Sequence, residues 1–258
     1  MTLPLSRRSN NVSIFNKEQY HVWKFVNCFG CEPGFSLPAI ASDRSNDVGR
    51  IEKATQAFQE IVGAPTPGIP KELLEAATCI AIFPGTDKPA YIFGAKYGKG
   101  LASCRTAGGW SAPLFLALGG SGGTGTGGES SGFQIGGTIS DVVMLFMNDH
   151  ALQSLMSDKF TIGADATVAA GPVGRDSVSA SEVKADILSY TRSKGTLEGF
   201  SLDGAFVQAD DSGDKAIYGA KGSRQDIVNG KVAVPKSAQK LVADLAEYAP
   251  HALAASHD

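Results

Sequence analysis

The sequence has no apolar run long enough to cross a membrane and no excess of positive charge. Its longest apolar stretches, Ala112 to Leu118 and Val142 to Met147, have the length of β-strands, well below the roughly 18 residues of a membrane-spanning helix. A net charge of −3 over 258 residues argues against a general nucleic-acid binder, which carries a basic stripe. The composition, with 43% hydrophobic and 19% charged residues, is that of an ordinary globular protein.

Cysteine is scarce, and the four cysteines do not form a metal or redox motif. Cys28 and Cys31 make a lone C-x-x-C, but no second ligand pair follows at zinc-finger spacing. A thioredoxin-like motif needs a helix directly after the cysteines, whereas Pro33 and Gly34 follow here. We therefore expect no metal and no cofactor, and we interpret Cys28 and Cys31 as incidental.

A glycine-rich segment, residues 119–132, contains eight glycines in fourteen positions. Gly123-Thr-Gly125-Thr-Gly127-Gly128 formally matches G-x-G-x-x-G, but a dinucleotide site needs that turn between a strand and a helix. Here Phe133-Gln-Ile135 continues as an apparent strand, and the phosphate-binding lysine of a P-loop is missing. The segment is predicted to be a flexible insertion, with no nucleotide as a partner.

Catalytic signatures are also lacking. No H-E-x-x-H occurs. Asp165 is the one acid between Thr161 and Arg175, and no partner acid, base or metal is evident for it. A buried Asp165 paired with Arg175 or Arg192 in a structural role is the expectation, and no enzymatic activity is predicted.

What is present around Asp165 is a run of small residues. From Thr161 to Arg175 almost every side chain is small, which allows another backbone to approach closely. This pattern predicts a tightly packed central strand that ends at Pro172, with Arg175 emerging from the turn behind it. Leucine at Ala169 or Gly171 should then be costly.

Residues 1–44 differ from the rest of the chain. The start is basic, the middle is patchily apolar, and Ala39-Ile40-Ala41 has the small residues of a signal-peptide cleavage site. Glu32 and Pro33 interrupt the apolar part. We predict a degraded leader or a disordered arm that contacts anionic lipid. A functional leader implies export to the cell envelope (periplasm), and otherwise the protein is cytoplasmic and peripheral to a membrane.

The remaining residues, 45–258, are predicted to form one domain. Apolar residues at helical spacing predict helices over Asp47 to Val62, after Pro70, after Asn148 and after Pro235. Short apolar runs predict strands, with turns at Gly98-Lys99-Gly100 and at the hairpin Asp210 to Asp214. The fold class is α+β: a twisted antiparallel sheet that can curl into a barrel, with helices mostly at its two ends. The predicted strands include Cys79–Phe83, 91–97, 101–106, 114–118, 139–147, 183–194 and 200–208.

Several longer motifs carry a family resemblance from roughly Asp47 to Tyr218. The motifs are 161–175 together with Gly109-Trp110-Ser111-Ala112-Pro113, Gly132-Phe133-Gln134-Ile135-Gly136, Met147-Asn148 and Ser189-Tyr190-Thr191-Arg192-Ser193-Lys194-Gly195. With these motifs in the family's order, the chain resembles the SYLF domain, a lipid-binding domain found alone in bacteria and fused to a Src-homology-three domain in eukaryotic actin-patch proteins. In eukaryotic relatives an amphipathic lipid-binding helix precedes the domain, which makes Asp47 to Val62 or the arm before it a candidate membrane element.

The resemblance implies a non-enzymatic module that binds anionic, phosphoinositide-like phospholipid at a membrane surface. Local charge suggests where, because Lys96, Lys99 and Arg105 stand together without an acid. The predicted lipid-binding residues are Lys96, Lys99, Arg105, Arg175, Arg192 and Lys194. Two alternatives stay open: a protein-interaction module of the actin-regulator type, and a small-ligand pocket or enzyme of unknown type.

Overall fold

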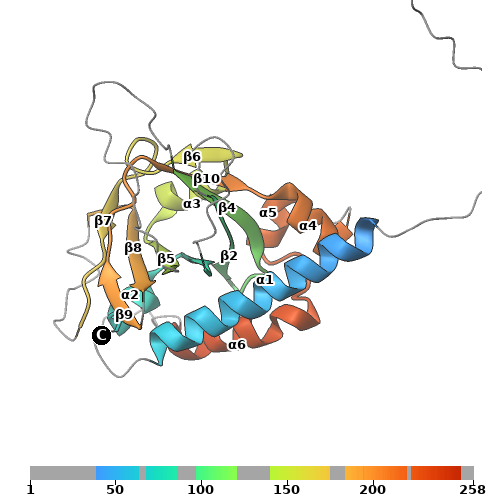
Figure 1. The fold of residues 1–258 in the computed structure, drawn as a ribbon, viewed down its shortest axis with the longest axis horizontal. Coiled ribbons are helices and arrows are strands. Elements are labelled where there is room, and N and C mark those ends of the chain that lie inside the picture. Colours follow the sequence, from blue (N-terminus) through green and yellow to red (C-terminus); the bar gives the residue numbers. More distant parts are fainter. Residues whose placement is uncertain are drawn as a thin grey trace, which may run out of the picture. The chain divides into compact units, whose positions relative to one another are not determined.

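In the computed structural model, the described helices and strands lie within residues 37–258 (Figure 1). The residues that it describes are 39–63, 68–85, 97–120, 140–174, 184–193, 195–219 and 222–250, without the side chains of 39–43, 97 and 140. The predicted strands at 91–96 and 133–135, the glycine-rich segment beyond Gly120, and Cys28 and Cys31 lie outside the described residues.

A strongly curled, open antiparallel sheet forms the centre of the fold (Figure 1). Its path through the described residues is β6-β10-β4-β2-β1-β5-β8-β7, with β3 beside β2 and β9 beside β8. The only parallel pair on this path is β7 with β8. The predicted α+β class is therefore confirmed, with the sheet as a half-barrel. The strands are β1 Cys79–Phe83, β2 Tyr97–Thr106, β3 Gly109–Trp110, β4 Leu114–Gly120, β5 Ser140–Phe146, β6 Lys159–Thr161, β7 Val168–Ala170, β8 Ile187–Ser193, β9 Thr196–Gly199 and β10 Ala205–Ala209.

Both faces of this sheet are buried. Alternate residues of β1 point to opposite sides, so that Ile80 and Ile82 join one apolar cluster while Ala81 and Phe83 join another. Helices α1, α2 and α6 cover the first side, and α3 and α5 contribute to the second. The helices are α1 Ala39–Val62, α2 Lys71–Ala76, α3 Asp149–Met156, α4 Asp211–Tyr218, α5 Arg224–Val228 and α6 Gln239–Tyr248, the last preceded by a 3-10 turn at Lys236–Ala238.

Helix α1 begins at Ala39, earlier than the predicted Asp47, and its apolar face is occupied. Ile51, Ala54, Phe58 and Ile61 are all fully buried. Helix α6 lies alongside, with the Phe58 and Tyr248 rings in a T-shaped, edge-to-face contact. Ala39-Ile40-Ala41, the expected cleavage site, forms the start of this helix. The stripe is thus core packing, and membrane insertion by this face would require α1 to leave the sheet.

The small-residue stretch does not form a central strand, so that prediction is wrong. Its first residue, Thr161, is the last of β6, and residues 168–170 form β7. These two strands are the ends of the sheet path, and a turn around Asp165 lies between them. The close approach expected at Gly171 is nevertheless present: a Cβ there would lie 2.0 Å from Cζ of Tyr190, and one at Gly199 would lie 2.0 Å from the Gly171 oxygen. The reason is that β7 and β9 share one edge of β8 and meet end to end over Tyr190.

Two predicted turns are also wrong. Gly98-Lys99-Gly100 is part of β2, where these three residues pair with Leu118, Ala117 and Leu116 of β4. Asp210 to Asp214 is not a hairpin turn: Asp210 caps the N-terminus of α4, its Oδ1 accepting a hydrogen bond from the Gly213 N–H. An aspartate at this position stabilises a helix start as readily as a turn, because both leave N–H groups without partners.

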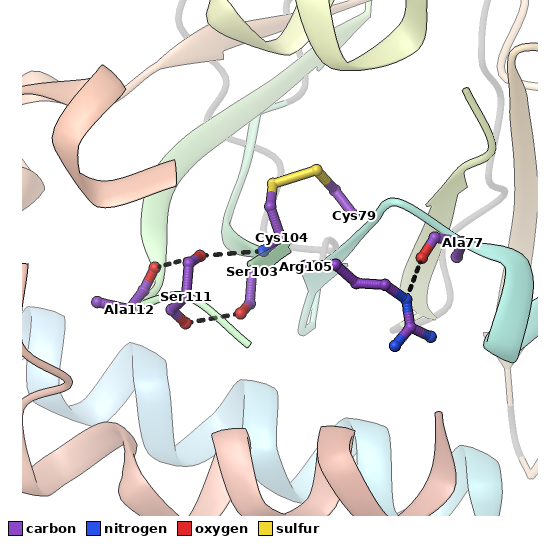
Figure 2. The surroundings of a disulfide bond; sticks show 7 residues. All are labelled: Ala77, Cys79, Ser103, Cys104, Arg105, Ser111 and Ala112. Atoms are coloured by element: carbon purple, nitrogen blue, oxygen red, sulfur yellow. Dashed lines mark hydrogen bonds between the residues drawn. A yellow bond between two sulfur atoms is a disulfide. The ribbon is translucent and has the colours of Figure 1, made fainter. Parts of the chain in front are cut away.

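A disulfide between Cys79 and Cys104 joins β1 to β2 (Figure 2). This bond was not predicted from the sequence. The two residues are directly opposite in the antiparallel register and both are buried. Beside them, Ser111 accepts a hydrogen bond from the Cys104 N–H at 3.0 Å, and Ser103 donates one to the Ser111 carbonyl at 2.7 Å. The bond therefore links the two central strands from inside the second cluster.

Candidate functional site

Three residues of the predicted lipid-binding set are described by the structure, and each of them interacts with a different group of partners. Lys99, Arg105 and Arg192 are described, whereas Lys96, Arg175 and Lys194 lie outside the described residues. Lys99 and Arg105 stand six residues apart on β2, a separation of about 20 Å in an extended strand, with buried Leu101 between them. The described members are therefore not gathered on one surface.

Arg105 is a structural cap for helix α2. Its Nε donates to the Ala77 carbonyl at 2.7 Å, and its Nη2 donates to the carbonyls of Leu74 and Glu75 at 2.9 Å (Figure 2 shows the first of these bonds). The guanidinium also lies 4.5 Å from the centre of the Trp110 ring. The last carbonyls of a helix have no partners inside the helix, so Arg105 satisfies groups that burial would otherwise leave unpaired.

Arg192 fastens the far end of α1 to the sheet. Its Nη1 pairs with the carboxylate of Glu60 on α1 and lies 3.4 Å from that of Asp141 on β5. The hydrogen bond from Arg192 lowers the pKa of Glu60 below its ordinary value. The predicted pairing of Arg192 with Asp165 is wrong. Asp165 is exposed and accepts a hydrogen bond from the Thr161 N–H at 2.7 Å, within its own turn.

Lys99 belongs to a different arrangement, centred on Asp210. The Oδ2 atom of this carboxylate lies 2.9 Å from Nη1 of Arg50 and 3.1 Å from Nζ of Lys99. Arg50 is buried, with its Nη2 at 2.7 Å from Asp47 and its guanidinium over the Phe115 ring. Burial raises the pKa of Asp210, but hydrogen bonds from Ser212, Arg50 and Lys99 outweigh it and hold the pKa at about 2.

A polar cavity of about 510 Å³ opens beside this cluster. The first half of α1 forms one wall, the end of β1 and β2 form others, and the N-terminus of α4 closes it. Among the described lining residues, three side chains are cations and one is an acid. The lining consists of Asn46, Asp47, Arg50, Lys53, Pro84, Gly85, Lys99 and Ser212.

The sequence analysis identified only Lys99 in this cavity. Arg50 and Lys53 lie inside the predicted helix, and 46, 47, 50 and 53 are spaced so that they share one side of it. That spacing marks a polar stripe next to the apolar one. The partner across the cavity, Asp210, was assigned to a hairpin turn, so nothing in the sequence brought the two segments together.

Behind the cavity lies an unusual carboxyl, Asp214 of α4. It is buried and its Oδ1 accepts a hydrogen bond from the Phe115 N–H at 3.0 Å. Burial raises the pKa of Asp214 to about 7, against the lowering effect of that hydrogen bond, and the charges of Asp211 and Asp210 add to the rise while that of Arg224 opposes it.

This carboxyl should make the fold less stable as the pH rises. Between about 3.8 and about 7 the folded protein binds a proton that the unfolded chain releases, so the free energy of unfolding falls across that range. We expect urea denaturation to show a loss on the order of 2 kcal/mol between pH 5 and pH 8. Asp214→Asn keeps the acceptor oxygen and should remove most of this loss. If the variant loses as much stability between pH 5 and pH 8 as the wild type, the pH dependence comes from other groups than Asp214.

At lower pH the opposite dependence applies. Asp210 and Asp186 both have a pKa held at about 2 by their hydrogen bonds, in spite of burial. Their contribution is present above about 4 and is lost as the pH falls towards 2. Stability should therefore be greatest near pH 4 to 5, between the two ranges.

The described residues contain neither a cluster of metal ligands nor a membrane-spanning helix. Among the described residues no three potential metal ligands come together. None of the helices described here has the length and apolar character needed to cross a bilayer. The site that the fold defines is accordingly a polar, cation-lined cavity on an α+β domain.

Comparison with known proteins supports the family resemblance. A family model described as "Ysc84: Las17-binding protein actin regulator" matches residues 127–248. Protein YSC84 of Saccharomyces cerevisiae is 28% identical over 212 residues, which cover 80% of this chain and 43% of the yeast protein. The human SH3 domain-containing YSC84-like protein 1 is 28% identical over 208 residues, 78% of this chain and 58% of its own length. The resemblance to the SYLF family is confirmed.

The chain spans about half the length of the curated relatives that it matches. The description of the matched family names a binding and regulatory role, and it does not name a catalytic one.

Proposed function

We propose that this chain is a non-enzymatic binding module that attaches to anionic phospholipid at a membrane surface, with phosphoinositide-like lipids as the preferred class. The observation that carries the proposal is Lys99: its side chain is 61% exposed, and within the described part of the chain its ion-pair partner is Asp210 alone. Lys53 of α1 lines the same cavity and is also exposed. Lys96, Arg175 and Lys194 remain predicted contributors.

Attachment of this kind would be electrostatic. Tyr248 is the one large hydrophobic side chain that is exposed among the described residues, at 37%, and the apolar face of α1 is buried. Each Lys or Arg near an anionic bilayer contributes about 1 kcal/mol. A few such residues give weak binding that salt screens, because the Debye length shortens to about 8 Å at physiological ionic strength.

Vesicle binding tests this proposal. Co-sedimentation should show the wild type bound to anionic vesicles at low salt, with little binding to neutral vesicles. The triple variant K96Q/K99Q/K194Q should bind several-fold more weakly, while K71Q/K231Q/K240Q, with the same loss of charge at exposed sites, should bind like the wild type. Arg105 is left unchanged because it caps α2. Equal binding by both triple variants would remove these lysines from the site.

A protein-interaction module of the actin-regulator type is the second candidate. The description of the matched family favours it, because it names an actin regulator that binds another protein. Under this alternative the chain should co-sediment with actin filaments in the absence of lipid. If it does so and ignores anionic vesicles at low salt, the protein-interaction function replaces the lipid-binding one.

A further inference from the structure

We propose that the cavity between α1, β2 and α4 is a binding site for a phosphate monoester carried on a small polar group. The proposal rests on the proposed function where the ester is a lipid headgroup. It stands by itself where the ester is a free phosphorylated molecule, because the same side chains recognise either source.

Size and polarity set the class of ligand. A volume of about 510 Å³ falls within the range of small-molecule sites, and it is far larger than a single phosphate needs. The lining is polar apart from Pro84 and Gly85, so an apolar ligand finds little surface to contact. A phosphorylated, hydroxyl-rich group matches both properties.

Charge sets the sign of the ligand. Among the described residues, Arg50, Lys53 and Lys99 line the cavity together with one acid, Asp47, and Asp210 lies behind two of the cations. Three cations against two acids leave these groups with a positive charge in excess, within a chain of net charge −3.

The three cations have different tasks. The Arg50 guanidinium is already shared between Asp47 and Asp210 and packs on Phe115, so it braces the wall. Lys53 makes no ion pair within the described part of the chain. Lys99 can leave Asp210, because its ammonium group is largely exposed to solvent and Arg50 continues to satisfy that carboxylate. Lys53 and Lys99 are thus the two ammonium groups that turn to a phosphate, each as a point charge.

The alternative is that the cluster merely clasps α1 to β2 and α4. A clasp needs Arg50 and Asp210 but does not need Lys53, which pairs with no acid among the described residues. Replacing Lys53 and Lys99 therefore distinguishes the two interpretations, because it leaves the buried Arg50–Asp210 pair intact.

The test uses calorimetric titration of the full chain with inositol trisphosphate at low salt. The wild type and the control K231Q/K240Q should bind with equal affinity, and K53Q/K99Q should bind at least about tenfold more weakly. Circular dichroism and melting temperature check that each variant is folded. Equal affinity of K53Q/K99Q and the control, or no binding by the wild type, overturns the proposal.

A second arm assigns the source of the phosphate. The same three proteins are mixed with vesicles of phosphatidylcholine plus either phosphatidylserine or phosphatidylinositol bisphosphate at matched charge. Preference of the wild type for the bisphosphate, lost in K53Q/K99Q, supports a lipid headgroup. Binding of the soluble probe without vesicle binding supports the cavity as a site for a free ester and rejects the lipid function. Vesicle binding that K53Q/K99Q retains in full supports the lipid function and rejects the cavity.

Discussion

Replacing Gly171 with leucine is expected to lower the free energy of unfolding by about 3 kcal/mol or more. Even a single added carbon would lie 2.0 Å from the ring of Tyr190, which is itself fully buried. The ring cannot move aside easily, because protein interiors are packed as densely as organic crystals. The backbone at the meeting point of β7 and β9 must therefore shift, and the Gly171 N–H to Ser189 carbonyl bond of 3.0 Å would be strained or lost.

Urea denaturation measures the loss, and Gly108→Leu is the matched control. Gly108 lies in an exposed turn with only the Thr106 hydroxyl, at 4.0 Å, near its added carbon, so this variant should change stability by about 0.5 kcal/mol or less. Ala169→Leu should fall between the two, because Ala169 is only partly buried beside the first cluster. Stability of Gly171→Leu equal to that of Gly108→Leu would contradict the tight junction over Tyr190.

Removing the disulfide is expected to lower the free energy of unfolding by about 3.5 kcal/mol, the loop-entropy value for the sequence separation of 25 between Cys79 and Cys104. The bond acts mainly on the unfolded chain, which it keeps from separating β1 and β2. The double variant C79A/C104A should therefore be far less stable than the oxidised wild type in urea.

Reductant provides the control for this experiment. With the bond reduced in the unfolded state, the wild type should lose most of its advantage, and the remaining difference reports the packing of the two buried sulfurs. A gap between the proteins that is unchanged by reductant would show that the bond contributes no cross-link. The redox state of these cysteines in protein taken from cells also bears on localisation, because disulfides persist in oxidising compartments.

The parts of the fold that the sequence predicted are those with a strong local signal. The apolar runs at β1, β4 and β5 are strands, and Asn148 caps α3 through a hydrogen bond from the Ala151 N–H. The helix after Pro235 buries the predicted face in the first cluster. In each case periodicity or a capping residue within a few positions decides the conformation.

The errors arise where distant segments decide the outcome. Small side chains in 161–175 signal close approach, but they do not say whether the neighbour lies on both sides of a strand or only over one edge. The strand pairing that places Cys79 opposite Cys104 is likewise a matter of register. Neither property is encoded within the segment itself.

The functional prediction was limited in the same way. Positive charges close in sequence were predicted to share one surface. Lys99 and Arg105 do lie on the same face of β2, but they are six residues apart and reach different partners. Arg105 binds carbonyls, Arg192 binds acids, and Lys99 alone reaches the cavity. Arg50 and Lys53 were missed because helix α1 was interpreted by its apolar stripe alone.

Titration of the wild-type chain with anionic vesicles tests the central claim, peripheral attachment by charge, most directly. Vesicles of phosphatidylcholine with and without phosphatidylserine or phosphatidylinositol bisphosphate are compared at about 50 mM and about 500 mM salt, where the Debye length falls from roughly 14 Å to roughly 4 Å. We expect binding to the anionic vesicles at low salt, near loss of binding at high salt, and no binding to phosphatidylcholine alone. Failure to bind anionic vesicles at low salt, or equal binding to neutral ones, would contradict the claim.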